Sequence, residues 1–298
     1  MMTKSMASIN LTVGIPCSNR PEKIYDCISS ILAGSTIPDE IFVLDSSSSN
    51  IFADIKVKIE KLDVNNKVKI VHISEQISPS EARKKIADST LSEYLLYLDD
   101  DMIVEDSSIE IMMEMIEKNN DIDILGCAVL EYGIWRDIGF KFDIGVIRNS
   151  KFVSKRAIRK EWMDLHSISL LGVDLITQPP FLIRRKVFES ISFDENYKWA
   201  YEIYDFFFGC FKANISSYVT KDAFVRHLPV SYDDDNFKSR KVLFNKEGKE
   251  YFSSKWGVTP EKEFQKNKYV DIFYQLLWKY RKKKMVKNKI KKDGVRYN

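Results

Sequence analysis

YLLYLDDDM, residues 94–102, runs from a short apolar segment directly into three aspartates, Asp99, Asp100 and Asp101. An apolar run of this length, without a polar side, is typical of a strand buried on both faces. Three adjacent carboxylates repel one another and are strongly hydrated, so the triplet either stays in water or holds a cation. Carboxylate oxygens are suitable ligands for Mg²⁺ or Mn²⁺. Asp99 and Asp101, two residues apart, could bracket one ion and the phosphates that it carries.

The chain around this stretch alternates between strand and helix patterns. The strand-like segments are residues 9–16, 40–45, 67–73, 94–99 and 124–132, and the helix-like segments are residues 20–34, 78–89 and 107–119. Such alternation, with strands apolar on both faces, predicts an α/β fold with a parallel sheet covered by helices. Ligands bind beyond the carboxyl ends of the strands in such sheets. Asp45 and the aspartate triplet both fall there.

The second half of the chain is less regular. Residues 133–175 give weak signals, which are compatible with loops or an antiparallel hairpin. Residues 181–191 indicate a strand that runs into a short helix, and residues 205–211, DFFFGCF, are apolar and aromatic. His72 lies inside an apolar strand, which favours a structural role. The four cysteines are widely spaced and form no metal-binding or disulfide pattern, so we expect them to be small core residues.

Several motifs follow one another in a characteristic order: VGIPCSNRPEKIYDCISSILAG (13–34), DEIFVLDSSS (39–48), SPSEARKKIADS (78–89), EYLLYLDDDM (93–102), and the segment from FLIRR to FVRH (181–227). This series resembles the family 2 glycosyltransferases and their GT-A-fold relatives over about residues 9–230. The resemblance implies a Rossmann-like, mostly parallel sheet flanked by helices, with a C-terminal helical extension. It divides the chain into a GT-A domain (1–230) and that extension (231–298). Within the domain, about 9–130 would bind the nucleotide sugar and about 131–230 the acceptor.

The resemblance also implies roles for individual residues. The nucleotide-sugar site would comprise Pro16, Cys17, Asn19, Arg20, Asp45, Ser46, Arg83, Asp99 and Asp100. In it Asp45 would touch the base and Arg83 the base or the diphosphate. A divalent cation, Mn²⁺ or Mg²⁺, would be bound by Asp99, Asp101 and His227. Glu202 or Asp205 would take the proton of the acceptor hydroxyl, whose very high pKa demands a base.

Three positions depart from the family pattern. The family usually has Glu-Asp where this chain has Glu202 followed by Ile203, so the choice between Glu202 and Asp205 stays open. Ser46 stands where a second aspartate often follows the second strand. Lys84 stands where an asparagine usually follows Ala-Arg.

The motifs together predict an inverting, metal-dependent hexosyl- or hexosaminyltransferase. Its donor would be a nucleoside-diphosphate sugar, with a UDP-sugar favoured, and its acceptor a hydroxyl of a glycan, a lipid-linked saccharide or a protein. One alternative is a nucleotidyltransferase, but such an enzyme needs a glycine-rich phosphate loop and IPCSNRPEK (15–23) has no glycine. The other is a binding protein that has kept the fold and lost catalysis, an alternative that Ile203 leaves open.

The charge distribution predicts a basic tail. From Lys268 onward there are 11 Lys or Arg and 2 Asp or Glu, against 35 and 41 in the rest of the chain. Residues 269–292 combine an apolar and aromatic stripe at helical spacing with dense lysines, a pattern suited to an anionic membrane surface or to packing on the domain. No apolar run would span a bilayer and the first residues lack a secretory signal, so we expect a cytoplasmic protein, peripheral at the inner face of the membrane if its tail binds there. No nucleic-acid recognition motif is present.

Overall fold

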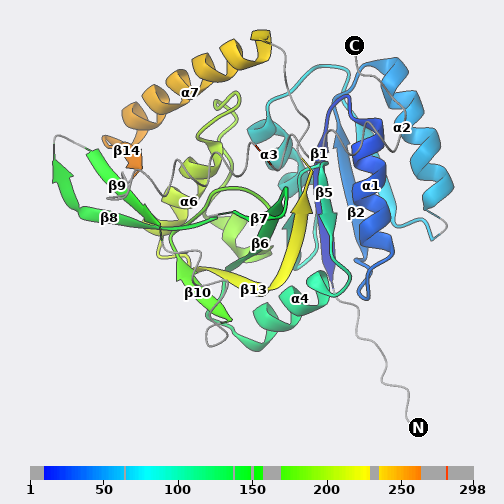
Figure 1. The fold of residues 1–298 in the computed structure, drawn as a ribbon, viewed down its shortest axis with the longest axis horizontal. Coiled ribbons are helices and arrows are strands. Elements are labelled where there is room, and N and C mark those ends of the chain that lie inside the picture. Colours follow the sequence, from blue (N-terminus) through cyan, green and yellow to red (C-terminus); the bar gives the residue numbers. More distant parts are fainter. Residues whose placement is uncertain are drawn as a thin grey trace.

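The computed structural model describes residues 10–63, 65–136, 138–148, 151–156, 169–228, 235–262 and 280. A ten-stranded mixed sheet forms its centre, with the order β10-β13-β6-β12-β4-β1-β2-β3, β5 paired to β13 and β7 paired to β6. Its strands are β1 (Leu11–Cys17), β2 (Glu40–Asp45), β3 (Val68–His72), β4 (Tyr94–Tyr97), β5 (Met102–Val104), β6 (Ile124–Glu131), β7 (Ile134–Trp135), β10 (Leu170–Val173), β12 (Phe181–Arg184) and β13 (Ser217–His227). The predicted α/β fold with strands flanked by helices is confirmed (Figure 1).

Strand direction determines which residues share an edge of the sheet. β1, β2, β3 and β4 are parallel, and β13 is parallel to β6, whereas β12 runs antiparallel to both β4 and β6. The carboxyl ends of β1, β2, β3, β4, β6 and β13 therefore lie along one edge, together with the start of β12. This is the edge at which ligands bind in parallel α/β sheets.

The helices are α1 (Pro21–Leu32), α2 (Ser49–Leu62), α3 (Pro79–Ser89), α4 (Ser108–Lys118), the 3₁₀ helix η1 (Arg185–Glu189), α6 (Glu202–Lys212) and α7 (Asp235–Trp256). α3 begins as its sequence predicts, because the Ser78 hydroxyl accepts a hydrogen bond from the Glu81 backbone N–H. It packs closely on β1 at Gly14, where an added Cβ would lie 2.5 Å from Cγ2 of Ile86. A larger residue at position 14 would force the Ile86 side chain to move, so Gly14 permits the close packing of α3 on β1.

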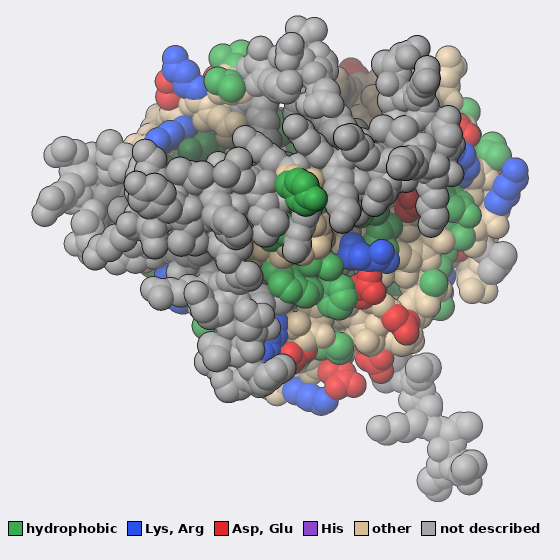
Figure 2. Space-filling model, viewed as in Figure 1, with side chains coloured by type: hydrophobic (Ala, Val, Ile, Leu, Met, Phe, Trp, Pro, Cys, Tyr) green, Lys and Arg blue, Asp and Glu red, His purple; other side chains and the backbone are tan. Residues whose placement is uncertain are grey.

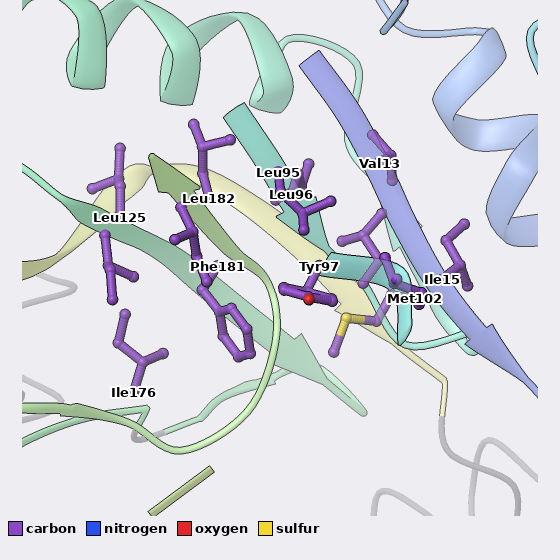
Figure 3. Packing of buried hydrophobic residues seen from close by; sticks show 14 of the residues in the cluster. Val13, Ile15, Leu95, Leu96, Tyr97, Met102, Leu125, Ile176, Phe181 and Leu182 are labelled. Atoms are coloured by element: carbon purple, nitrogen blue, oxygen red, sulfur yellow. The ribbon is translucent and has the colours of Figure 1, made fainter. Parts of the chain in front are cut away.

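The core of the sheet consists of apolar side chains from adjacent strands. Val13 and Ile15 of β1 lie beside Leu95, Leu96 and Tyr97 of β4, all of them buried (Figure 3). At the face viewed in Figure 1, acidic side chains gather near α4 with single basic ones among them (Figure 2).

The region from 133 to 175 contains the antiparallel hairpin that was one of its two predicted forms. β8 (Gly139–Arg148) pairs with β9 (Lys151–Arg156), and β11 (Leu175–Ile176) and β14 (Thr259–Lys262) complete a small second sheet with the order β11-β8-β9-β14. The predicted C-terminal extension begins with α7, whose Phe252 is fully buried. Among the described helices, none combines the length and apolarity needed to cross a bilayer. Residues 269–292, apart from residue 280, lie outside the described part of the chain.

Candidate active site

The aspartate triplet occupies the tight turn between β4 and β5. β5 runs back antiparallel to β13, with Met102 opposite His227, and the Leu228 backbone N–H donates to the Asp101 carbonyl at 2.9 Å. This pairing holds the triplet next to the end of β13. Asp100 and Asp101 are buried, with exposed fractions of 4% and 7%, so the triplet does not simply lie in bulk water.

Arg20 joins the triplet to the end of β1. It follows Asn19, whose φ of 56° is a left-handed turn conformation that asparagine tolerates. Its Nη1 lies 2.7 Å from Asp100 Oδ1 and 3.4 Å from Asp101 Oδ2. Burial raises the pKa of Asp100 to about 7, although the guanidinium acts in the opposite direction. The cluster thus concentrates negative charge at one point of the edge and balances only part of it with Arg20.

His227 contacts Asp101. Its Nε2 is 3.3 Å from Asp101 Oδ1, and its Nδ1 is 3.0 Å from Oε2 of Glu131, which ends β6 and is buried. Burial alone would lower the pKa of His227, but the hydrogen bonds to Asp101 and Glu131 raise it to about 9. Burial likewise opposes ionisation of Asp101, yet the His227 contact leaves the pKa of Asp101 below its usual value.

Two of the three predicted metal ligands, Asp101 and His227, lie close enough together to bind one divalent cation. The facing Asp101 oxygen and His227 nitrogen are spaced like two neighbouring ligands of one ion, each about 2.0–2.2 Å from it. Glu131 binds the other ring nitrogen of His227, as carboxylates commonly do behind metal-bound histidines. Asp99, the third predicted ligand, is held elsewhere, and within the described residues no three His, Cys, Asp or Glu side chains converge into a complete metal site.

Arg83 links the triplet to α6. It projects from α3, and its guanidinium donates to Asp99 Oδ1 at 2.9 Å through Nη2 and to Glu202 Oε1 at 3.1 Å through Nη1. Arg83 is only 4% exposed, and its buried Nε has no hydrogen-bond partner among the described residues. Burial raises the pKa of Glu202, partly offset by Arg83. Glu202 is therefore a buried carboxylate connected to the triplet through one arginine.

Asp205, the alternative to Glu202, has different surroundings. Its carboxylate accepts hydrogen bonds from Tyr197 Oη at 3.1 Å, Lys255 Nζ at 2.8 Å and Trp256 Nε1 at 2.7 Å, and it is 3% exposed. Lys255 and Trp256 belong to α7. Asp205 therefore fastens α6 to α7, whereas the hydrogen bonds of Glu202 lead toward the triplet.

The end of β2 forms a second polar cluster at the same edge. Asp45 has no exposed surface, and its carboxylate accepts hydrogen bonds from the Ser47 backbone N–H (3.1 Å), the Ser47 hydroxyl (2.6 Å) and His72 Nδ1 (2.8 Å). The Ser47 hydroxyl in turn accepts from the Asn19 backbone N–H at 2.7 Å. Asp45 was predicted to touch the base directly, but in this structure its carboxylate is enclosed by its own neighbours.

The remaining predicted residues lie close by. Ser46 is mostly buried, and its backbone N–H donates to the Cys17 carbonyl at 2.9 Å. Cys17 is buried next to Pro16 at the end of β1, and burial keeps the pKa of its thiol well above the usual value, so it is an inert core residue. Glu131 was not predicted. Its sequence signal, an acidic residue at the end of a buried strand, is the same as that of the triplet.

Comparison with known proteins identifies the fold and the family. The model of glycosyl transferase family 2 matches residues 12–192, more than half of the chain. Among solved structures, GalNAc-T7 in complex with UDP, GalNAc and Mn²⁺ is similar with a TM-score of 0.59 and 16% identity, over 74% of this chain and 44% of that one. TarS of S. aureus is similar in two structures, one of them of its residues 1–349. That structure has a TM-score of 0.52 and 15% identity, over 73% of this chain and 60% of that one.

The second TarS structure has a TM-score of 0.53 and 17% identity, over 78% of this chain and 38% of that one. The chain thus spans less than two thirds of the length of each of these neighbours, and at such identities the likeness concerns the fold. The search of curated proteins gave no match. The family match over residues 12–192, on a sheet whose binding edge carries the aspartate triplet, shows that the chain belongs to glycosyl transferase family 2 and has the GT-A fold.

Proposed function

We propose that the protein is an inverting, metal-dependent glycosyltransferase that moves a hexosyl or hexosaminyl group from a nucleoside-diphosphate sugar to a hydroxyl. The observation that carries this proposal is the chain of contacts from Asp99 through Arg83 to Glu202. Through Arg83 a buried carboxylate is linked to the acidic cluster, which supports our assignment of the carboxylate as the base and of the cluster as the site of the cation and phosphates.

Two arginines are available to the diphosphate of the donor. Arg20 is paired with Asp100, and Arg83 is paired with Asp99. Guanidinium groups bind phosphate oxygens in a bidentate manner. In our proposal the donor's phosphates take over part of these contacts, and the two arginines stabilise the negative charge that grows on the departing diphosphate.

Asp101 and His227 are the proposed protein ligands of Mn²⁺ or Mg²⁺, with Asp99 joining them or contacting the ribose when the donor is present. A bound divalent cation supplies Lewis-acid stabilisation of the leaving diphosphate. Glu131 orients His227 for this role by accepting the hydrogen bond of its Nδ1. Asp100, paired with Arg20, keeps that arginine beside the phosphates.

Glu202 is the proposed base. As the acceptor oxygen attacks the anomeric carbon, its proton passes to the Glu202 carboxylate, the new C–O bond forms, and the bond to the diphosphate oxygen breaks. Attack from the face opposite the leaving group inverts the anomeric configuration. Burial favours the role, because a base whose pKa is raised above the ordinary glutamate value is better matched to proton transfer near neutral pH.

The donor is proposed to be a UDP-sugar, and the acceptor a glycan, a lipid-linked saccharide or a protein. Residues 1–230 would form the catalytic unit, with α7 fastened to it through Asp205 and Lys255. The basic segment 269–292, outside the described residues, would hold this cytoplasmic enzyme at an anionic membrane surface.

A thermal-shift screen tests the proposed function. Nucleoside diphosphates and nucleotide sugars are added to the wild-type protein and to Asp101→Ala, each with and without Mn²⁺. A ligand that binds only the folded state raises its Tm. We expect at least one nucleotide to raise the Tm of the wild type when Mn²⁺ is present, and Asp101→Ala to lose this increment. No Tm increase with any nucleotide would contradict the proposal.

A further inference from the structure

The carboxyl ends of β2 and β3 carry a carboxylate–imidazole pair that the proposed reaction does not use. Asp45 and His72 are opposite one another in the register of the two strands, and His72 Nδ1 lies 2.8 Å from Asp45 Oδ2. Ser47 supplies two further hydrogen bonds to the same carboxylate. Because Asp45 has no exposed surface, a ligand at this end of the edge meets His72 and not Asp45.

The pair gives His72 a defined orientation and a defined free nitrogen. An ionised carboxylate only accepts hydrogen bonds, so Nδ1 carries the hydrogen and, in the neutral ring, Nε2 is an acceptor. No described residue hydrogen-bonds Nε2, and the side chain is 21% exposed. Phe52 stacks on the ring with centroids 4.0 Å apart and an interplanar angle of 14°, which fixes its plane. Nε2 of His72 is therefore a hydrogen-bond acceptor with a fixed direction.

The loop between β1 and α1 connects this pair to the phosphate end of the site. The Asn19 backbone N–H donates to the Ser47 hydroxyl at 2.7 Å, and the Asn19 side-chain oxygen accepts from the Ser48 backbone N–H at 3.0 Å. The next residue, Arg20, is bound to the triplet. A nucleoside diphosphate that lies along this loop, with its phosphates at Arg20, directs its base toward the ends of β2 and β3.

We propose that His72, oriented by Asp45, selects the base of the donor nucleotide by accepting the ring N–H of uracil at Nε2. This inference rests on the proposed function, because it assumes that a nucleoside diphosphate occupies the edge. Uracil carries a hydrogen on N3, whereas cytosine carries a lone pair there. With cytosine, N3 of the base and Nε2 of His72 would both be acceptors, so neither would have a hydrogen-bond donor.

Two substitutions separate the two nitrogens of the ring. In His72→Asn the side-chain amide occupies the place of Nδ1, so it can keep the hydrogen bond to Asp45 while the acceptor at Nε2 is lost. In His72→Gln the amide reaches the place of Nε2, so either its oxygen or its N–H₂ group can face the base, while the bond to Asp45 is lost. Isothermal titration of UDP and CDP in the presence of Mn²⁺ gives the ratio of their dissociation constants for each protein, and thermal melts monitor folding.

We expect the wild type to bind UDP more tightly than CDP by on the order of tenfold or more, the size of effect that one unsatisfied acceptor pair produces. His72→Asn should reduce this ratio to near one, chiefly through weaker UDP binding. His72→Gln should also reduce it, but chiefly through tighter CDP binding, because its amide can turn its N–H₂ group toward cytosine N3. Equal or better binding of CDP by the wild type would overturn the inference, as would an unchanged ratio in His72→Asn. If His72→Asn fails to fold, the wild-type ratio and the tighter CDP binding expected of His72→Gln decide.

The proposed function and this inference fail in distinguishable ways. If neither nucleotide binds the wild type with Mn²⁺, the proposed donor site is wrong and the inference falls with it. If UDP binds and is preferred but His72→Asn does not change the ratio, the donor site stands and the role of His72 alone is refuted.

Discussion

Glu202→Gln and Asp205→Asn, compared side by side, test which carboxylate of α6 is the base. Both changes replace a buried carboxylate with an amide of the same shape, so they are matched in chemistry and differ in location. Glu202 is connected to the triplet through Arg83, whereas Asp205 is bound by Tyr197, Lys255 and Trp256. We therefore expect Glu202→Gln to affect the reaction and Asp205→Asn to affect stability.

The contacts set the size of each effect. Removing a general base lowers transfer by about 10²–10⁴-fold. Glu202→Gln should do so with a small change in stability, because Arg83 keeps its ion pair with Asp99. In Asp205→Asn the amide nitrogen faces Lys255 Nζ, so a charge-assisted hydrogen bond becomes a contact between two donors. This change should cost about 2–4 kcal/mol of unfolding free energy, and the Tm should fall by about 5–10 °C.

Two measurements on each protein are needed: the transfer rate at a temperature where both variants are folded, and an unfolding curve. Binding of the nucleotide should survive in both variants, which separates loss of the base from loss of the donor site. If Asp205→Asn lost transfer by two orders of magnitude with an unchanged melting curve, and Glu202→Gln stayed active, the assignment of Glu202 would be refuted.

Three further predictions follow from the contacts and charges. Glu131→Gln should weaken Mn²⁺-dependent nucleotide binding by roughly 10–100-fold in calorimetry, because it removes the carboxylate behind His227. The control Glu105→Gln, which removes a more exposed acid at the end of β5, should leave binding unchanged. Equal effects of the two changes would contradict the role of Glu131. Burial raises the pKa of Glu202, so the base is lost by protonation as the pH falls through that raised value. The acid limb of the pH profile of kcat/KM should therefore lie above the ordinary glutamate pKa of about 4.3. A limb at the ordinary value would argue against Glu202. Deletion of residues 279–298 should abolish salt-sensitive co-sedimentation with vesicles of anionic lipid and preserve activity on a short soluble acceptor, whereas equal pelleting of both proteins would exclude the tail as the anchor.

Much of the fold is predictable from periodicity. Each strand and helix predicted before residue 132 is present with ends shifted by at most two residues, because the apolar patterns that define them are also the buried faces. α2 was not predicted, since its first turn lies in the polar run SSSSN, which suggests a loop. The antiparallel direction of β12 and its place between β4 and β6 also could not be predicted from the sequence, because strand order depends on long-range pairing.

The site shows the same division between local and long-range information. The triplet, Arg20, Arg83 and His227 could be located from motifs, and the structure connects Arg20 and His227 to Asp101 and Arg83 to Asp99. The choice between Glu202 and Asp205 could not be made, because two partners of Asp205, Lys255 and Trp256, come from α7, about fifty residues later. His72 was interpreted as structural because it lies inside an apolar strand. Its position opposite Asp45 depends on the register of β2 and β3, which the sequence does not show.

The most direct test of the central claim is an acceptor-free donor hydrolysis assay. The wild-type protein and Asp101→Ala are incubated with Mn²⁺ and a panel of nucleotide sugars, and in parallel with Mn²⁺, nucleoside triphosphates and sugar phosphates. The released products are identified by chromatography. We predict slow release of a nucleoside diphosphate and free sugar from at least one donor, dependent on the cation and lost in Asp101→Ala. If the protein released no nucleoside diphosphate from any donor, and instead formed pyrophosphate from a nucleoside triphosphate and a sugar phosphate, the chain would be a nucleotidyltransferase and the account would be wrong.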